Sequence, residues 1–198
     1  MSLATYRKRR DLGKSPELKA RRARSRKRPR FVIQEHAARS HHFDFRLEVD
    51  GVLKSWAVPK GPSTDPRDKR LAMPVEDHPL DYADFEGVIP QGQYGAGAVV
   101  VWDRGTWDNL TGRDGEPIPV AQALADGHLV FALHGEKLKG GYALRRVATG
   151  KDERWLLIKR KDTAADARRR PVSSQPRSVI SGRTIAELER AAEQADDR

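Results

Sequence analysis

The 198-residue chain contains no cysteine, which excludes disulfides, zinc–thiolate sites and a cysteine nucleophile. It also lacks a run of about 18 apolar residues, the length of a membrane-spanning helix. Its N-terminus, MSLATYRKRR, has no apolar stretch of the kind found in signal peptides. These absences predict a soluble, intracellular protein. Aromatic residues are few, at 7%, but 37% of the residues are hydrophobic, so we expect one compact domain with polar extensions.

Acidic residues are scarce in the first 30 positions, which hold thirteen of the 38 lysines and arginines but only Asp11 and Glu17. The rest of the chain carries 25 basic and 26 acidic side chains and is almost neutral. The densest basic run, Arg21 to Arg30, repels itself and has nothing to bury. We therefore expect residues 1–30 to form a flexible basic arm that binds a polyanion such as nucleic acid. The alternative is a solubilising tail.

Short apolar runs separated by Gly, Pro and Asp predict strands from Phe31 onward. Asp50-Gly51 has the composition of a two-residue type I′ turn, which predicts an antiparallel hairpin between the strands on either side. Six or more strands without long alternating helices indicate a mainly β fold. We expect a compact antiparallel β-barrel with a few short flanking helices over residues 31–162. The five clearest runs are Phe31–Ile33, Val52–Val58, Ala98–Trp102, His128–Leu133 and Trp155–Lys159.

Two helices are expected outside the strands. One covers Pro119–Ala125, and the other lies at the C-terminus, where Thr184 and Glu187 have the spacing of a capping box. Residues 164–182 are rich in Arg, Ser and Pro and predict a linker. Residues 163–198 are therefore expected to form a linker followed by a short C-terminal helix.

Polar and apolar residues alternate from His42 to Glu48, shortly after His36. Because strand side chains alternate between faces, His42, Asp44 and Arg46 are expected to project from one face of a strand. An imidazole and a carboxylate two residues apart can share a divalent cation, and His36 could supply a third ligand. Arg46 could bind phosphate oxygens. The alternative, which the sequence leaves open, is that this face is only the solvent-exposed side of an amphipathic strand.

A second polar motif surrounds His78, which precedes Pro79 and so lies on an extended or turn segment. Its sequence neighbours include three carboxylates, Glu76, Asp77 and Asp81. Carboxylates favour the protonated form of an imidazole, so we expect His78 to be charged near neutral pH. Lys60 and Arg70, which lie between the two motifs, are further candidates for binding phosphate.

These motifs resemble, in the same order, the signature blocks of the 3′-phosphoesterase module of bacterial DNA ligase D, which also occurs as a stand-alone protein in bacteria and archaea. The similarity runs from Tyr6 to about Asp162, and its blocks are residues 36–48, 53–62, 76–82 and 85–97. The resemblance implies a β-barrel enzyme that trims 3′ ends in two steps. A phosphodiesterase step removes a terminal ribonucleoside, and a phosphomonoesterase step removes the remaining 3′-phosphate.

The resemblance also implies roles for individual residues. Mn²⁺, or Co²⁺ or Zn²⁺ in its place, would be held by His36, His42 and Asp44. The catalytic residues that engage the scissile phosphate would be Arg46 and His78. The other phosphate-binding residues would be Lys60, Arg70, Tyr82, Arg10, Asp11 and Glu17, of which the N-terminal ones match the family pattern with substitutions. No protein nucleophile is needed, because water can attack with the help of the metal.

The implied substrates are DNA or RNA/DNA primer–template 3′ ends. Polymerase and ligase functions are expected to come from other chains, so the implied partners are a separate ATP-dependent DNA ligase, a polymerase and end-binding proteins. We expect a monomer that does not bind membranes and that lies in the cytoplasm near the nucleoid of a bacterium or an archaeon.

Two other functions use the same features. A pair of histidines and one carboxylate also form the facial triad of iron(II) oxygenases on β-barrel folds, but such an enzyme would need a cosubstrate site, and the basic arm would have no role. A non-catalytic nucleic-acid-binding adaptor would use the arm for binding and the barrel for docking. It would leave the converging His, Asp and Arg side chains unexplained.

Overall fold

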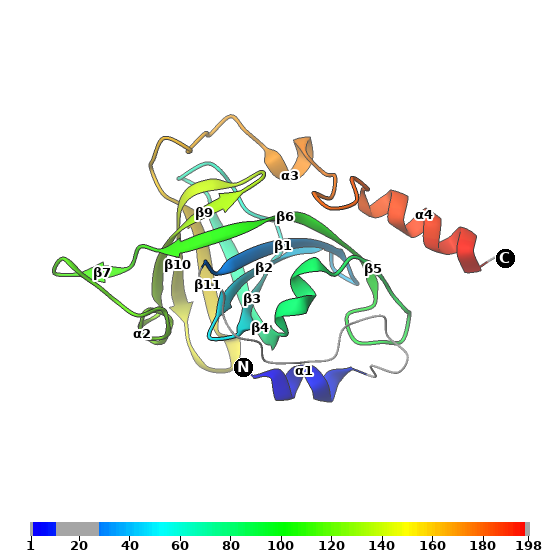
Figure 1. The fold of residues 1–198 in the computed structure, drawn as a ribbon, viewed down its shortest axis with the longest axis horizontal. Coiled ribbons are helices and arrows are strands. Elements are labelled where there is room, and N and C mark those ends of the chain that lie inside the picture. The colour runs from blue at the N-terminus through cyan, green and yellow to red at the C-terminus, as the bar shows by residue number, and fades with distance from the viewer. Residues whose placement is uncertain (1, 11–27, 197–198) are drawn as a thin grey trace.

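The computed structural model describes residues 2–10 and 28–196, and these form a closed antiparallel β-barrel (Figure 1). The barrel strands are β1 (Arg30–Ala37), β2 (His42–Val49), β3 (Val52–Val58), β4 (Lys69–His78), β6 (Gly97–Asn109), β9 (His128–Gly135), β10 (Lys139–Ala148) and β11 (Arg154–Lys159). They follow the order β1-β2-β3-β4-β11-β10-β9-β6, and β6 pairs again with β1. The predicted mainly β barrel is confirmed.

Short elements flank the barrel. The strand β5 (Gly87–Ile89) pairs with the start of β6, and β7 (Gly112–Arg113) forms a small hairpin with β8 (Glu116–Pro117). The helices are α1 (Leu3–Arg9), α2 (Val120–Asp126), α3 (Pro171–Ser174) and α4 (Ile185–Asp196), with 3₁₀ turns η1 (Leu80–Asp84) and η2 (Gly150–Asp152). Among the described residues, no helix is both long and apolar enough to span a bilayer.

Local sequence signals explain two of these elements. In the turn between β2 and β3, Asp50 and Gly51 both have positive φ, 49° and 79°, as the type I′ turn requires. At the start of α4, the Glu187 backbone N–H donates to Thr184 Oγ1 at 3.3 Å. The Thr184 N–H donates to Glu187 Oε2 at 2.9 Å. The predicted hairpin and capping box are both confirmed.

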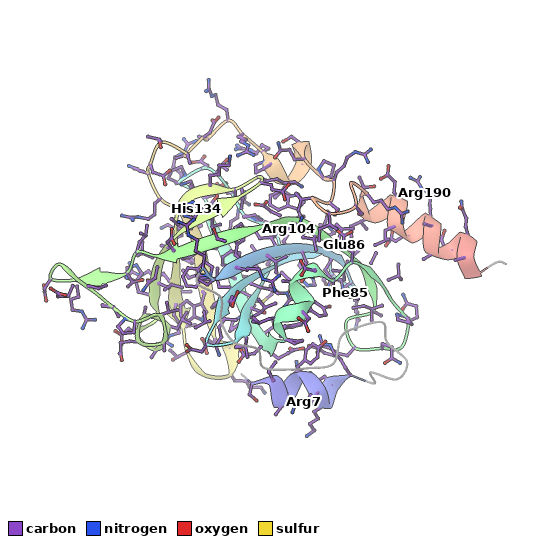
Figure 2. All side chains as sticks on the ribbon, in the orientation of Figure 1. Arg7, Phe85, Glu86, Arg104, His134 and Arg190 are labelled. Carbon is purple, nitrogen blue, oxygen red and sulfur yellow. The ribbon has the colours of Figure 1, made fainter. Side chains whose placement is uncertain are left out.

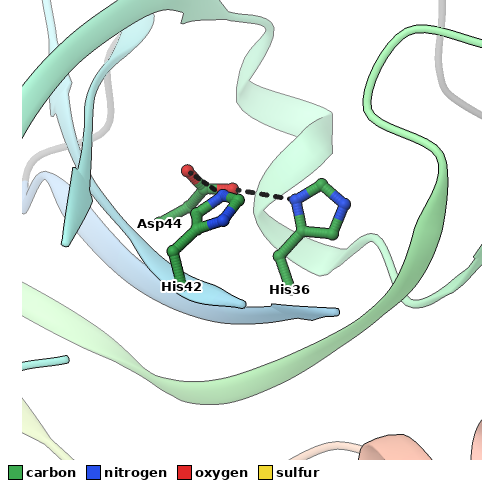
Figure 3. Close-up of side chains that lie close together, drawn as sticks. All are labelled: His36, His42 and Asp44. Carbon is green, nitrogen blue, oxygen red and sulfur yellow. Dashed lines mark ion pairs between the residues drawn. The ribbon is translucent and has the colours of Figure 1, made fainter. Parts of the chain in front are cut away.

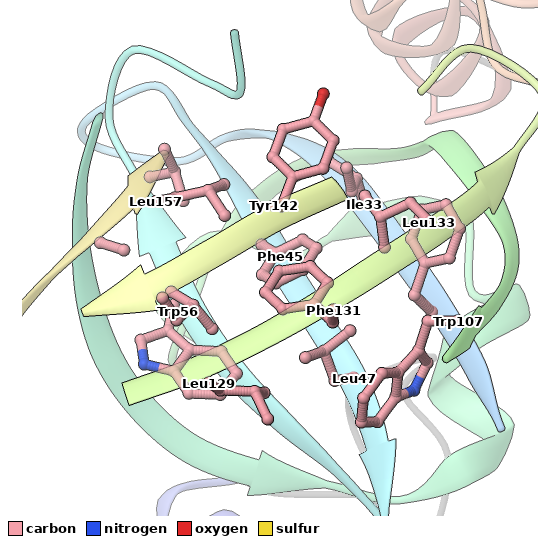
Figure 4. Close-up of a cluster of buried hydrophobic side chains, with 14 of the residues drawn as sticks. Ile33, Phe45, Leu47, Trp56, Trp107, Leu129, Phe131, Leu133, Tyr142 and Leu157 are labelled. Atoms are coloured by element: carbon pink, nitrogen blue, oxygen red, sulfur yellow. The ribbon is translucent and has the colours of Figure 1, made fainter. Parts of the chain in front are cut away.

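The barrel interior is filled by large aromatic and aliphatic side chains (Figure 4). Phe45 of β2 stacks on Phe131 of β9 with ring centroids 5.7 Å apart, and Trp107 meets Phe131 edge to face at 6.2 Å. The alternate residues of β2 point the other way, as predicted. Asp44 and Arg46 are buried, however, and His42 is only partly exposed, because a second apolar cluster packs on the outer face of the wall formed by β1, β2 and β3.

This second cluster joins wall residues such as Val32 and Leu53 to Leu80 and Tyr82 of η1 and to Tyr6 of α1. It buries the polar face of β2, so that Asp44 is 6% exposed and Arg46 is 2% exposed. The view of this face as the wet side of an amphipathic strand is therefore wrong.

Part of the expected flexible arm is ordered. Leu3–Arg9 forms α1, which packs against β4 with the ring of Tyr6 fully buried. The expectation of flexibility is wrong for this segment because Tyr6 supplies an apolar anchor among the basic residues. Residues 11–27, which include Asp11, Glu17 and most of the run Arg21 to Arg30, lie outside the described residues.

The segment predicted to be a linker runs beside β6 (Figure 1) and forms hydrogen bonds with it. One edge of β6 pairs with β5 near its start and with β9 near its end. Between them, the Val101 N–H donates to Glu86 Oε1 at 2.7 Å, and the Val179 N–H donates to the Val101 carbonyl at 2.9 Å. Trp102 Nε1 donates to the Gln175 carbonyl at 2.9 Å. Residue 179 of this segment thus supplies a donor to the Val101 carbonyl, and Glu86 supplies an acceptor to the Val101 N–H, two backbone groups on this edge of β6.

One buried carboxylate holds the turn between β9 and β10. Asp103 accepts the backbone N–H groups of residues 136–138 at 2.9–3.0 Å and that of Arg104 at 3.0 Å. Replacing Asp103 with Ala should lower the free energy of unfolding by about 3 kcal/mol or more, because buried N–H groups lose their acceptor. Urea unfolding measures this loss. The control Asp108→Ala removes an exposed partner of His134 and should cost under about 1 kcal/mol. Equal losses would contradict the assignment.

Candidate functional site

A cavity of about 410 Å³ opens on the outer face of the barrel wall, where β1, β2 and β4 meet η1, the loop after β5 and the end of α1. It collects seven of the predicted site residues, from parts of the chain that are far apart in sequence. These are Arg10, His36, His42, Asp44, Arg46, His78 and Tyr82.

Three of these side chains form a group that could hold a metal ion (Figure 3). His36 and His42 are directly opposed in the β1–β2 pair, and Asp44 follows on the same face of β2. His36 Nδ1 lies 3.6 Å from Asp44 Oδ2, and His42 Nε2 lies 3.5 Å from Asp44 Oδ1. These separations are close to the distance of about 3.4 Å between two donors that each lie about 2.1 Å from one tetrahedral ion. All three donor atoms lie within 4.8 Å of one another, so the group could hold a divalent cation.

Backbone carbonyls orient both imidazoles. His36 Nε2 lies 2.8 Å from the Gly95 carbonyl, and His42 Nδ1 lies 2.7 Å from the Ser40 carbonyl. When the rings are neutral and these nitrogens donate their N–H groups, the other nitrogen of each ring, on the side of Asp44, has a lone pair to offer to a cation. Gly95 has φ +77°, a conformation that favours glycine. Sequence reasoning missed both carbonyls, because a backbone ligand leaves no side-chain signal.

Arg46 is fixed by a ring of buried acceptors. Its Nε donates to Gln34 Oε1 at 2.8 Å, one Nη1 N–H donates to Ser55 Oγ at 2.9 Å, and Nη2 donates to Asp44 Oδ2 at 2.9 Å. Nη1 also lies 2.9 Å from His78 Nδ1. Within the described residues, one N–H on Nη2 remains for a ligand. Gln34 and Ser55 were missed as site residues, although a glutamine in an apolar strand was a usable signal.

Burial and charge set the protonation states around this ring. Burial alone would raise the pKa of Asp44, but the charge of Arg46 and hydrogen bonds from His36 and His42 hold it well below its usual value. Burial opposes protonation of His42, yet the neighbouring Asp44 outweighs it, so the pKa of His42 is raised. A cation that binds here must therefore compete with a proton on His42, and its affinity should rise with pH.

The expected charge on His78 is wrong. Burial, together with the positive charges of Arg46 and Arg10, holds the pKa of His78 well below its usual value. The carboxylates next to it in sequence are engaged elsewhere: Glu76 pairs with Arg10 at 2.7 Å, and Asp77 pairs with a lysine of β3 at 2.9 Å. His78 is therefore neutral at pH 7, with arginines as its nearest charged neighbours.

Arg10 reaches the cavity because its surroundings hold it there. Its side chain is 5% exposed, pairs with the buried Glu76 and lies over the ring of Tyr6 with Cζ 4.0 Å from the centroid. The ring of Tyr94 lies 5.2 Å from the same carbon atom. Sequence reasoning noted Glu76 only as a neighbour of His78, so its role in holding Arg10 was missed.

Lys60 and Arg70 do not line this cavity. Met73 of β4 faces the cavity, whereas Ala72 packs in the barrel core. Arg70 shares the face of Ala72, because side chains two residues apart on a strand point the same way. Lys60 and Arg70 instead line a second cavity of about 190 Å³, with two arginines of the C-terminal segment.

Residues 34–146 match the family described as "DNA Ligase D 3′-phosphoesterase domain". The chain is 52% identical over 188 residues to the "Multifunctional non-homologous end joining protein LigD" of Pseudomonas aeruginosa, covering 92% of this chain and 22% of that protein. It is 45% identical over 161 residues to the "Multifunctional non-homologous end joining DNA repair protein LigD" of Mycobacterium tuberculosis, covering 81% and 20%. For the LigD protein of Mycolicibacterium smegmatis the identity is 43% over 161 residues, covering 81% and 21%.

The chain spans about a fifth of the length of these curated relatives. The family match itself covers more than half of the chain and contains the His36, His42 and Asp44 group. On this match, the chain belongs to the DNA ligase D 3′-phosphoesterase domain family, a family of hydrolases.

Proposed function

We propose that the chain heals DNA 3′ ends for non-homologous end joining. A phosphodiesterase step removes a 3′-terminal ribonucleoside, and a phosphomonoesterase step then removes the 3′-phosphate, leaving a 3′-OH for ligation. The observation that carries this proposal is the three-ligand group next to two buried arginines in one cavity. The names of the LigD relatives support the context of end joining.

Phosphate recognition would come from positive charge already fixed in the cavity. Lewis-acid chemistry would come from a divalent cation, Mn²⁺ by preference, held by His36, His42 and Asp44. The remaining N–H of Arg46 and the guanidinium of Arg10 offset charge on the phosphate oxygens as water attacks. Because these groups are held before substrate arrives, they need little rearrangement during the reaction.

His78 and Tyr82 complete the proposed phosphate site. The ring of Tyr82 lies 5.1 Å from Arg46 Cζ and 4.8 Å from the ring of His78. A bound phosphate brings negative charge to His78, which favours protonation of its imidazole. His78 is thus proposed to gain a proton on substrate binding and to donate it toward the leaving group.

Two parts of the proposal concern partners. The basic residues of the N-terminal segment are proposed to bind the duplex, and the substrates are proposed to be DNA or RNA/DNA primer–template ends. A ligase, a polymerase and end-binding proteins are the proposed partners in repair. The iron(II) oxygenase and adaptor alternatives receive no support from the comparisons, whose family is one of phosphoesterases.

The direct test uses labelled primer–templates that end in one ribonucleotide, a 3′-phosphate or a 5′-phosphate. With Mn²⁺ the first two should be trimmed to a 3′-OH and the third should remain intact, and a chelator should stop the reaction. Co²⁺ or Zn²⁺ in place of Mn²⁺ tests the choice of metal. Intact 3′-phosphate ends under these conditions would refute the proposal.

Removing a ligand should abolish both activities. His42→Ala or Asp44→Ala should reduce turnover at least about 100-fold, because two remaining donors hold the cation weakly and without defined geometry. His41→Ala is the matched control, since His41 is the next residue but is exposed and pairs with Glu35. Near-normal turnover of either ligand variant at saturating Mn²⁺ would show that the metal lies elsewhere. Calorimetric Mn²⁺ titration gives an independent readout.

The depressed pKa of His78 predicts a pH dependence of stability. As pH falls below 6.5 the unfolded chain gains a proton on this residue before the folded chain does, so unfolding becomes easier by up to about 1.4 kcal/mol per pH unit. His78→Asn should flatten the decline in unfolding free energy between pH 6.5 and 5, whereas the exposed His134→Asn should not. The raised pKa of His42 affects the wild type and both variants alike, so it does not alter the comparison. Identical slopes would mean that folding does not lower the pKa of His78.

A further inference from the structure

The second cavity is strongly basic. Its lining includes Lys60 at the turn after β3, Arg70 of β4, and Arg169 and Arg170 from the segment before α3. Arg70 pairs with Asp68 at 2.9 Å, and this is the one ion pair that the four cations make within the described residues. The Nε atom of Arg70 is buried and has no hydrogen-bond partner there. The cavity therefore holds more positive charge and donor capacity than the protein itself uses.

Contacts with the barrel and within the segment before α3 hold Arg169 and Arg170 in place. Thr64 Oγ1, in the loop between β3 and β4, donates to the Asp166 carbonyl at 2.8 Å. Arg169 Nη2 donates to the Lys137 carbonyl at 2.9 Å and to Gln175 Oε1 at 3.0 Å. Arg170 Nη1 donates to the Ala167 carbonyl at 2.6 Å and to the Arg169 carbonyl at 3.3 Å. Each guanidinium thus uses two of its five N–H groups, and three on each remain without a partner among the described residues.

The two cavities are neighbours. Pro59 lines the first and Lys60 lines the second, and consecutive residues are about 3.8 Å apart. On β4, Met73 lines the first cavity and Arg70, three residues away, lines the second from the opposite face of the strand.

We propose that the second cavity binds backbone phosphates of the strand whose 3′ end is processed in the first. The inference rests on the proposed function and deepens it, because it assigns Arg169 and Arg170 of the C-terminal segment to substrate binding. A polyanionic strand fits the observations better than a single free phosphate, because one ligand then meets both positively charged cavities. Phosphate contacts of this kind fix position without reading sequence.

The test compares substrates of two lengths. For the double variant R169A/R170A, we expect the KM for a primer–template with a 3′-phosphate to rise about tenfold, and the slope of log KM against log salt concentration to fall by about one to two. A 3′-phosphorylated dinucleotide carries a single internal backbone phosphate and can make few contacts in the second cavity, so its KM should change far less. The double variant R183A/R190A is the control. It removes the same charge near and within α4, where Arg190 projects away from the barrel (Figure 2), and its KM values should match those of the wild type.

Three outcomes would overturn the inference: an unchanged KM for the primer–template, an equal rise for both substrates, or the same rise in the control. Binding of the labelled primer–template is also followed by fluorescence anisotropy. If the wild type hydrolyses neither substrate, the proposed function fails, and the change in anisotropy still decides whether the second cavity binds the strand. Arg170→Gln, at an exposed side chain, serves as a second variant if the double variant folds poorly.

Discussion

The burial of one guanidinium controls the chemistry of the first cavity. An ion in the interior costs several kcal/mol unless it is paired and hydrogen-bonded, and Arg46 meets this condition through Asp44, Gln34 and Ser55. The same charge keeps Asp44 ionised and His78 neutral. The barrel wall therefore carries a polar network between two apolar clusters, and each member of that network depends on its neighbours.

The sequence predicted what depends on local spacing. Period-two alternation in residues 42–47 correctly indicated a strand with two different faces, and Asp50-Gly51 indicated the hairpin that sets its register. Two of the candidate metal ligands, His42 and Asp44, were found because they share a strand face, and His36 was included because it is close to them in sequence. The structure places His36 on the adjoining strand β1, directly opposite His42. Strands β4 and β10 were not predicted, because Pro74 interrupts the apolar pattern of β4 and two consecutive glycines lie at the start of β10.

What the sequence did not predict depends on contacts between distant segments. The charge of His78 was wrong because Arg10 and Arg46 approach it through space, while the carboxylates beside it in sequence pair with other cations. The polar face of β2 was left open between two readings because only the fold shows that η1 and α1 cover it. Arg70 lies outside the first cavity because its side chain leaves the other face of β4. This face could be assigned only once the bounds of β4 were known.

The strand β11 has a consequence for how the chain reaches this structure. It lies between β10 and β4 and completes the barrel, although the family match ends at residue 146, before β11 begins. The partner of β11 in β4 was synthesised about eighty residues earlier, so closure depends on a contact of high sequence separation. During translation the barrel cannot close until β11 has emerged from the ribosome. Until then the edges of β4 and β10 that pair with β11 have no partner, and unpaired strand edges are prone to aggregation.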